Sequence, residues 1–364
     1  MRHPFSVLIL LVATCLFAEQ HSSANSSGGI LRVFPLNQSW SIEDSIGISR
    51  EIRELSTQVF FSYPVVDRLN LAFNGARVST GGDSKSISGF TDVQISANYF
   101  LTSFDLVLSL GVNLPSGESQ LSEPDFQTSL LLSDPIFRFQ VPNMGQGWRV
   151  SPGVSWAKKI NDRLAVGIGA AYQAISEYKF RKEITETYDP GDEWAVAGGF
   201  DMRLSRATLM SCDLLFTFYG TDKLENVVVI EAGNKMVLKI GFLKYFDRDK
   251  MELLARYRNR TKNTVIATET DMKFLPNEVE LKGQYYRFLS QQVGINFIAE
   301  ARIYESLANA RFSDGPIWGL GILPAFDINS NVSIPLRLKY LWGNFKDDYT
   351  VSGIEAGAGV SVSF

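Results

Sequence analysis

Apolar and polar residues alternate along most of this 364-residue chain. In the segment 106–113, leucine or valine occupies every even position, while the odd positions hold mainly small or polar residues. Successive side chains of a β-strand point to opposite faces, so this segment predicts a strand with one apolar and one mostly polar face. The same period of two recurs at 163–173, 293–304, 332–342 and 354–364. The pattern therefore predicts an all-β protein.

The alternating runs are long for a soluble protein. Strands in soluble domains usually hold about 5–6 residues, whereas a strand that crosses a bilayer at a tilt needs about 9–11. The alternating runs in this chain are as long as strands that cross a bilayer. We therefore expect a single transmembrane antiparallel β-barrel, in which the apolar rows face lipid and the polar rows line the lumen.

Short and long connections alternate between the expected strands. The short ones lie at 64–67, 102–103, 161–162, 205–206, 247–250, 289–291 and 329–331. The long ones lie at 79–89, 114–147, 175–192, 220–234, 261–276, 305–315 and 345–350. Outer-membrane barrels have short periplasmic turns and longer extracellular loops, so this alternation favours an integral barrel of the bacterial outer membrane.

The strand count follows from the same pattern. We expect about fifteen strands after residue 54, and bacterial single-chain barrels have an even number of strands. The segment 40–52 is the natural addition, which gives about sixteen strands in a barrel over 40–364. Its apolar residues all occupy even positions: Trp40, Ile42, Ile46, Ile48 and Ile52. Fourteen strands is the alternative, with the start of the mature chain acting as a plug.

The first residues are expected to be removed. Residues 1–18 combine a basic start at Arg2 with an apolar run that ends before Ala18, which is typical of a secretory signal peptide. We expect cleavage after Ala18, with Ala24 as the alternative site. The segment 19–39 is then a periplasmic N-terminal segment or a plug.

Histidine and cysteine are scarce, with two of each in the whole chain. His3 and Cys15 fall in the expected signal peptide, which leaves His21 and Cys212. A disulfide framework, a histidine zinc site and a catalytic triad all need more of these residues. We therefore expect no enzyme, no cofactor and no metal. The net charge of −4 gives no basic excess for nucleic acid.

The longest connection, 114–147, is expected to contain a short helix. Ser122 is a suitable N-cap, Pro124 suits the first turn, and Asp134-Pro135 ends the helix. Its apolar face would be formed by Phe126, Leu130 and Leu131. Two interpretations remain open. The loop narrows the pore and offers an apolar groove to a ligand, or it is an extracellular cap packed on its neighbours.

Charged residues occupy the rows opposite the apolar ones. If the apolar rows face lipid, the lumen is lined by Lys235, Lys239, Arg256, Arg258, Arg260, Glu278, Glu280, Lys282, Glu300, Arg302, Arg337 and Lys339. Rings of fixed charge set the ion preference of a pore, so these residues could form an electrostatic filter. The alternative is a ladder of salt bridges, because both signs occur side by side.

Several stretches resemble outer-membrane channel proteins. The first are Gly89-Phe90-Thr91-Asp92-Val93, Asn98-Tyr99-Phe100-Leu101 and Leu110-Gly111-Val112-Asn113-Leu114-Pro115-Ser116-Gly117. Others are Gly145-Gln146-Gly147-Trp148, Ser151-Pro152-Gly153-Val154-Ser155-Trp156 and Asn161-Asp162-Arg163-Leu164. They are similar to the meta-pathway (aromatic-degradation) type and, more distantly, to FadL-type hydrophobic-solute channels. These motifs specify the barrel and not the solute.

The resemblance implies a channel for passive passage or uptake of small solutes, hydrophobic or aromatic ones included. A non-conducting structural or adhesive barrel is the alternative, and a barrel enzyme is disfavoured by the lack of histidine. The expected partners are outer-membrane lipid, lipopolysaccharide, and the barrel-assembly machinery through Phe364. Whether the barrel works alone or as a trimer stays open.

Overall fold

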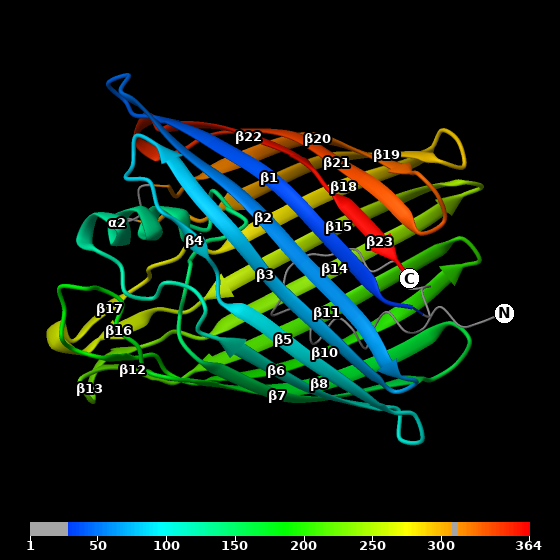
Figure 1. Ribbon diagram of the computed structural model, residues 1–364, viewed down its shortest axis with the longest axis horizontal. Helices are drawn as coiled ribbons and strands as arrows, with labels where there is room; N and C mark the ends of the chain where they lie inside the picture. Colours follow the sequence, from blue (N-terminus) through cyan, green and yellow to red (C-terminus); the bar gives the residue numbers. More distant parts are fainter. Residues whose placement is uncertain (1–27, 308–311) are drawn as a thin grey trace.

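The computed structural model describes residues 28–307 and 312–364. The expected signal peptide lies outside them. The chain forms a closed antiparallel barrel of sixteen strands (Figure 1). In chain order these are β1 (Ile30–Glu43), β2 (Ser49–Val66), β3 (Leu69–Gly82), β4 (Ser88–Phe90) with β5 (Val93–Leu101), β6 (Leu106–Leu114), β7 (Arg149–Lys159), β8 (Leu164–Ile175), β10 (Glu193–Ser205), β11 (Thr208–Tyr219), β14 (Lys235–Phe246), β15 (Asp249–Arg260), β18 (Glu278–Phe288), β19 (Val293–Tyr304), β20 (Gly315–Asp327), β21 (Val332–Asn344) and β22 (Thr350–Ala358) with β23 (Val360–Ser363).

Two of the sixteen barrel strands are each interrupted once. The strand β3 pairs with both β4 and β5, and β21 pairs with both β22 and β23, so each of these two pairs of elements forms one strand. The barrel closes where β1 pairs with β22 and β23, for example Trp40 with Gly353 and Ile30 with Ser363. Closure satisfies the backbone hydrogen bonds of every strand from its two neighbours, which a strand in lipid requires.

The first strand differs from the expected one. A turn at 44–48 interrupts the predicted strand 40–52, because an Oδ atom of Asp44 accepts hydrogen bonds from the backbone N–H groups of Ile46 and Ile48. Gly47 at φ +80° completes this turn. The barrel begins at Ile30, so the boundary predicted at residue 40 is wrong. The count of about sixteen is confirmed, and the alternative of fourteen is wrong.

The long connections gather at one end of the barrel and the short turns at the other (Figure 1). We call these the long-loop end and the short-turn end. Five short strands in the long loops form a second sheet: β9 (Tyr188–Asp189), β12 (Thr221–Leu224), β13 (Val227–Glu231), β16 (Asn263–Val265) and β17 (Thr270–Met272). Two 3-10 turns also lie in connections at this end. The turn η2 (Ile266–Thr268) lies between β16 and β17, and η3 (Lys346–Asp348) lies between β21 and β22.

The helix expected in the longest loop is confirmed as α2 (Glu123–Leu132), with Ser122 at the N-cap and Ser133 at the C-cap. The Ser122 hydroxyl donates its hydrogen bond to Asp125 instead of accepting one from the helix backbone. Within the described ranges, no helix is long and apolar enough to cross a membrane.

The two faces of the barrel wall have opposite character. Outward side chains such as Leu320 and Ile168 are apolar, and 56% and 62% of their surface is exposed. Inward side chains on the same wall include Glu280 and Arg302, which are about 1% exposed. A soluble protein would bury the first group and expose the second. The inversion defines a transmembrane β-barrel.

Candidate functional site

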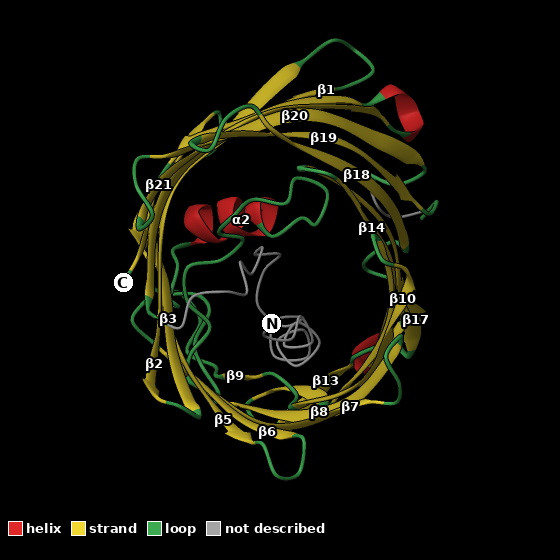
Figure 2. Cartoon of the chain, turned by 90° about the vertical axis from the view of Figure 1, so that its right-hand side faces the viewer, coloured by secondary structure: helices red, strands yellow, loops and turns green. Residues whose placement is uncertain are grey.

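The connection between β6 and β7, residues 115–148, enters the barrel; we call it the inner loop. Figure 2 looks along the barrel and shows α2 inside the ring of strands, close to one part of the wall. Figure 1 places α2 at the long-loop end, where Phe126 packs on Phe180 of the next long loop, whereas residues 138–141 contact inward side chains of the wall. The inner loop thus has features of both sequence interpretations. Its contacts with the wall are of two kinds, aromatic packing and buried ion pairs.

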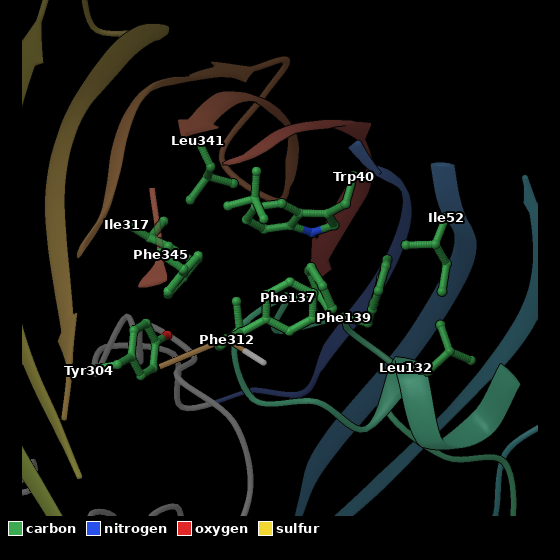
Figure 3. Close-up of a cluster of buried hydrophobic side chains, with 12 residues drawn as sticks. Trp40, Ile52, Leu132, Phe137, Phe139, Tyr304, Phe312, Ile317, Leu341 and Phe345 are labelled. Carbon is green, nitrogen blue, oxygen red and sulfur yellow. The ribbon is translucent and has the colours of Figure 1, made fainter. Parts of the chain in front are cut away.

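Aromatic packing centres on Phe137, which is fully buried. Its ring lies edge-on to Trp40 of β1, with the centroids 5.4 Å apart, and edge-on to Phe312, at 5.3 Å (Figure 3). Ile52, Leu341 and other side chains from β2, β19, β20 and β21 complete the cluster. Trp40 and Ile52 thus face the interior, although their apolar row was expected to face lipid. They are buried there because the inner loop covers them.

The ion pairs centre on Arg138. Its Nη1 and Nη2 atoms each lie 3.0 Å from a carboxylate oxygen of Glu280, and Nη2 also lies 2.6 Å from Glu278. Burial alone would lower the pKa of Arg138, but Glu280 and Glu278 outweigh it and hold this pKa well above its ordinary value. The guanidinium group is therefore permanently charged, and it ties the inner loop to β18.

Two wall arginines share the same carboxylates. Arg256 Nη2 lies 3.0 Å from Glu278 and 2.5 Å from Glu280. Arg258 Nη2 lies 3.1 Å from Glu278. Three guanidinium groups thus meet two buried carboxylates. Such a network is stable only when its charges are paired, and here each arginine reaches at least one of the two carboxylates.

The inner loop is held on the opposite side by β1 and β2. The backbone N–H of Gln140 donates to Gln38 Oε1 at 2.7 Å, and its side-chain amide donates to Gln58 at 2.8 Å. The backbone N–H of Val141 donates to Glu54 Oε1 at 3.1 Å. From β19, the guanidinium of Arg302 donates to the carbonyl of Ile136 at 2.8 Å. The loop therefore binds to the wall from β18 to β2.

A second group of ion pairs lines the wall beside the inner loop. Lys339 lies 2.8 Å from Glu300, and Arg337 lies 2.5 Å from Glu355. Arg302 lies 3.5 Å from Glu300. These strands carry a ladder of alternating charge and not a row of one sign.

The structure places all of the charged residues that the sequence singled out on inward rows. Eight of them form the ion pairs described above: Arg256, Arg258, Glu278, Glu280, Glu300, Arg302, Arg337 and Lys339. The others lie in the same rows by cross-strand register: Lys235, Lys239, Arg260 and Lys282. Lys235 stands opposite Arg260, and Lys239 stands opposite Arg256.

The apolar residues singled out on α2 do not form one packed face. The ring of Phe126 lies 5.4 Å from that of Phe180 in the next long loop. Leu131 packs against the aromatic cluster, whereas half of the Leu130 surface is exposed. The helix is anchored mainly by Leu132, which is buried.

Sequence reasoning missed Arg138 and Phe137. The available signal was the alternation Phe137-Arg138-Phe139, a strand-like pattern inside a segment expected to be a loop.

The inner loop covers only part of the inner wall. Inward side chains beneath it, such as Glu54 and Ser56, are fully buried. Inward side chains such as Ser155 on β7, Asp201 on β10 and Asp213 on β11 remain partly exposed. Nearer the long-loop end of β10 and β11, the inward side chains Ala195, Leu215 and Thr217 are buried. Among the described residues, no group of three His, Cys, Asp or Glu side chains is placed to hold a metal ion.

No protein-family model matches the sequence, and no curated protein matches it. Solved structures do resemble the fold. A bacterial polysaccharide outer membrane secretin has 10% identity and a TM-score of 0.50, over 93% of this chain and 99% of that one. A mutant of the TodX monoaromatic hydrocarbon channel has 12% identity and a TM-score of 0.49, over 97% and 92%.

The outer membrane channel DcaP of Acinetobacter baumannii has 12% identity and a TM-score of 0.46, over 96% of this chain and all of that one. At these identities the likeness concerns the fold alone. The chain is an integral β-barrel of the outer-membrane type.

Proposed function

We propose that this protein is an outer-membrane channel for the passive passage of small solutes. One observation carries the proposal: Glu54 and Ser56 are fully buried beneath the inner loop, whereas the inward side chains of Ser155, Asp201 and Asp213 stay partly exposed. A barrel filled by its loop would bury inward residues all around. Partial covering instead supports a narrowed passage along the uncovered wall.

The passage would be narrowed by a fixed element. The inner loop is held by Arg138 on one side and by Gln140 and Val141 on the other. The rings of Phe137 and Phe139 are buried among wall residues, so these two rings offer no open apolar groove. The inward side chains that stay accessible, such as Asp201 and Asp213, are polar, which favours water-soluble solutes over the hydrophobic ones that the family resemblance suggested.

The channel would act in the outer membrane, with lipid and lipopolysaccharide against its apolar outer surface. Half of the Phe364 ring surface is exposed, and the ring stacks at 6.1 Å on Tyr63 of β2. An exposed aromatic ring there supports recognition by the barrel-assembly machinery. Replacing Phe364 with serine would then lower the amount of barrel in the outer membrane without changing the stability of refolded protein by more than about 1 kcal/mol.

Conductance tests the proposal directly. The purified full chain, inserted in planar bilayers, should give discrete conductance steps. A variant in which a flexible Gly-Ser linker replaces 118–140 should give larger steps, because the passage is wider. A barrel that shows the heat-dependent gel mobility of a folded protein but no conductance would favour the structural or adhesive alternative.

A further inference from the structure

We propose that Lys235, Arg260 and Tyr219 form a binding site for small organic carboxylates at the long-loop end of the lumen. The inference rests on the proposed channel function and adds the class of solute. It is drawn from three observations: two cations opposite each other, one aromatic ring near both, and no carboxylate within ion-pair distance of either among residues 28–307 and 312–364.

The two cations are direct neighbours across the sheet. Lys235 begins β14, Arg260 ends β15, and the register places them opposite each other. The Lys235 ammonium lies 5.9 Å from the ring centroid of Tyr219, and the Arg260 guanidinium lies 5.3 Å from it. Each distance is within the range of a cation–π interaction. Tyr219, at the end of β11, therefore holds both positive charges at one point of the inner wall.

Like charges directly opposite each other destabilise an antiparallel pair, unless an anion lies between them. Further along the same strands, Lys239 and Arg256 stand opposite each other in the same way. There Asp213 stands opposite Lys239 on the next strand, and Glu280 pairs with Arg256. In the described part of the chain, neither Lys235 nor Arg260 has a carboxylate within ion-pair distance.

The surrounding wall reinforces the positive potential. Beside this pair, Arg138, Arg256 and Arg258 share two carboxylates, which leaves an excess of positive charge. The nearest acid by register is Glu278, which stands opposite Arg258 on the strand next to Arg260, and it already pairs with Arg138, Arg256 and Arg258. On the other side, Glu193 stands opposite Tyr219. Two further acids lie deeper in the barrel. Asp213 is level with Lys239, and Asp201 lies beyond it. The pair thus lies in a stretch of wall where cations outnumber acids.

Carboxylates fit this arrangement better than other small anions. A planar guanidinium group donates two parallel hydrogen bonds to a carboxylate, and the ammonium group can donate a third. The site lies at the rim and not in a closed pocket, so binding would be weak and reversible. That is what conduction requires, because a solute must also leave.

The test compares the wild type with the double variant Lys235→Gln/Arg260→Gln. A matched control, Arg68→Gln/Lys158→Gln, removes the same charge from exposed residues near the short-turn end. In planar bilayers with a KCl gradient, we expect the wild type and the control to prefer chloride and the double variant to lose that preference. In detergent, calorimetric titration should show benzoate binding that is about tenfold weaker in the double variant, or about 1.4 kcal/mol. Neutral benzamide should bind to none of them.

The outcomes separate the two proposals. A double variant that conducts with unchanged ion preference and binds benzoate like the wild type overturns the inference and leaves the channel intact. A folded wild type that conducts nothing overturns the channel, and the benzoate titration alone then decides the site. If the double variant does not fold, the single variants replace it, each with about a threefold loss of benzoate affinity.

Discussion

Arg138 and Glu280 make a two-point contact inside the barrel, between residues 142 positions apart in the chain. The arginine belongs to the inner loop and the glutamate to β18, where its side chain is 1% exposed. This pair is one of the anchors that hold the loop inside the lumen, and the loss of either partner leaves a buried charge with fewer neighbours.

Replacing Arg138 with alanine should therefore release the inner loop. Breaking a buried pair on one side typically costs about 3–5 kcal/mol, because the remaining charge is uncompensated. Arg256 and Arg258 still touch the two carboxylates, so we expect the lower part of that range. Limited proteolysis should cut the loop faster, and conductance steps should grow.

Lys182→Ala is the control for this change. Lys182 pairs with Glu118 at 2.8 Å, and about half of each side chain is exposed. Such surface pairs contribute at most about 1 kcal/mol. Equal protease sensitivity of the two variants would mean that Arg138 does not anchor the loop.

Phe137→Ala should destabilise the folded barrel by about 3–5 kcal/mol, because it leaves a cavity among buried aromatic rings. The matched variant is Leu130→Ala on α2, whose side chain is half exposed. Its effect should stay within about 0.5 kcal/mol. Urea unfolding in lipid vesicles, followed by tryptophan fluorescence, measures both. A larger loss at Leu130 would show that the helix packs through a different face.

The inner loop should also respond to pH through Asp134. Burial raises the pKa of this carboxyl, and the N–H of Ile136 at 3.0 Å opposes the rise only in part. A raised folded-state pKa means that the folded loop binds the proton more tightly than the unfolded loop. This contribution to stability is full below the ordinary value of 3.8 and is lost as the pH rises through the folded pKa.

Asp134→Asn cannot ionise but keeps the acceptor for Ile136. The variant loop should be better protected than the wild type at neutral pH and equally protected in acid. Hydrogen exchange at the Phe137 amide, corrected for the intrinsic pH dependence, measures the difference. Protection that is lower in the variant at neutral pH would contradict the sign of this argument.

Gly47→Ala tests the turn that separates β1 from β2. At φ +80° a side chain is strained, and we expect a loss of about 1 kcal/mol in unfolding free energy. Gly81→Ala in β3 is the control, because a methyl group there meets no atom within 4 Å. Its effect should be neutral or slightly stabilising. Equal losses at both positions would point to a general intolerance of alanine and not to this turn.

The sequence predicted the barrel well because a period of two marks each strand and each loop interrupts it. The same period could not say which apolar rows face lipid. Trp40 and Ile52 continue an alternating pattern, yet they face inward, because a loop more than 80 positions away covers them (Ile52 to Phe137). Only the three-dimensional path of that loop distinguishes the two faces.

The candidate site was predicted in part. The alternation predicts that Arg256 and Glu280 both face the lumen, since each strand must turn one face to it. Arg138 could not be found in this way, because it lies in a loop with no fixed register to any strand. Likewise, which acids the neighbouring strands bring opposite Lys235 and Arg260 depends on the register between strands, which the sequence pattern does not give.

The closing contact between β1 and the pair β22 and β23 has a consequence for biogenesis. Ile30 stands opposite Ser363, so the seam joins strands that are made first and last. Before β22 and β23 exist, β1 exposes a row of backbone groups that lipid cannot satisfy, at several kcal/mol for each group. Partial chains therefore have no stable place in the bilayer, and pairing of such distant segments is slow. Insertion must wait until the whole chain has been delivered, and an open β1 edge is where a neighbouring unfinished chain would attach by mistake.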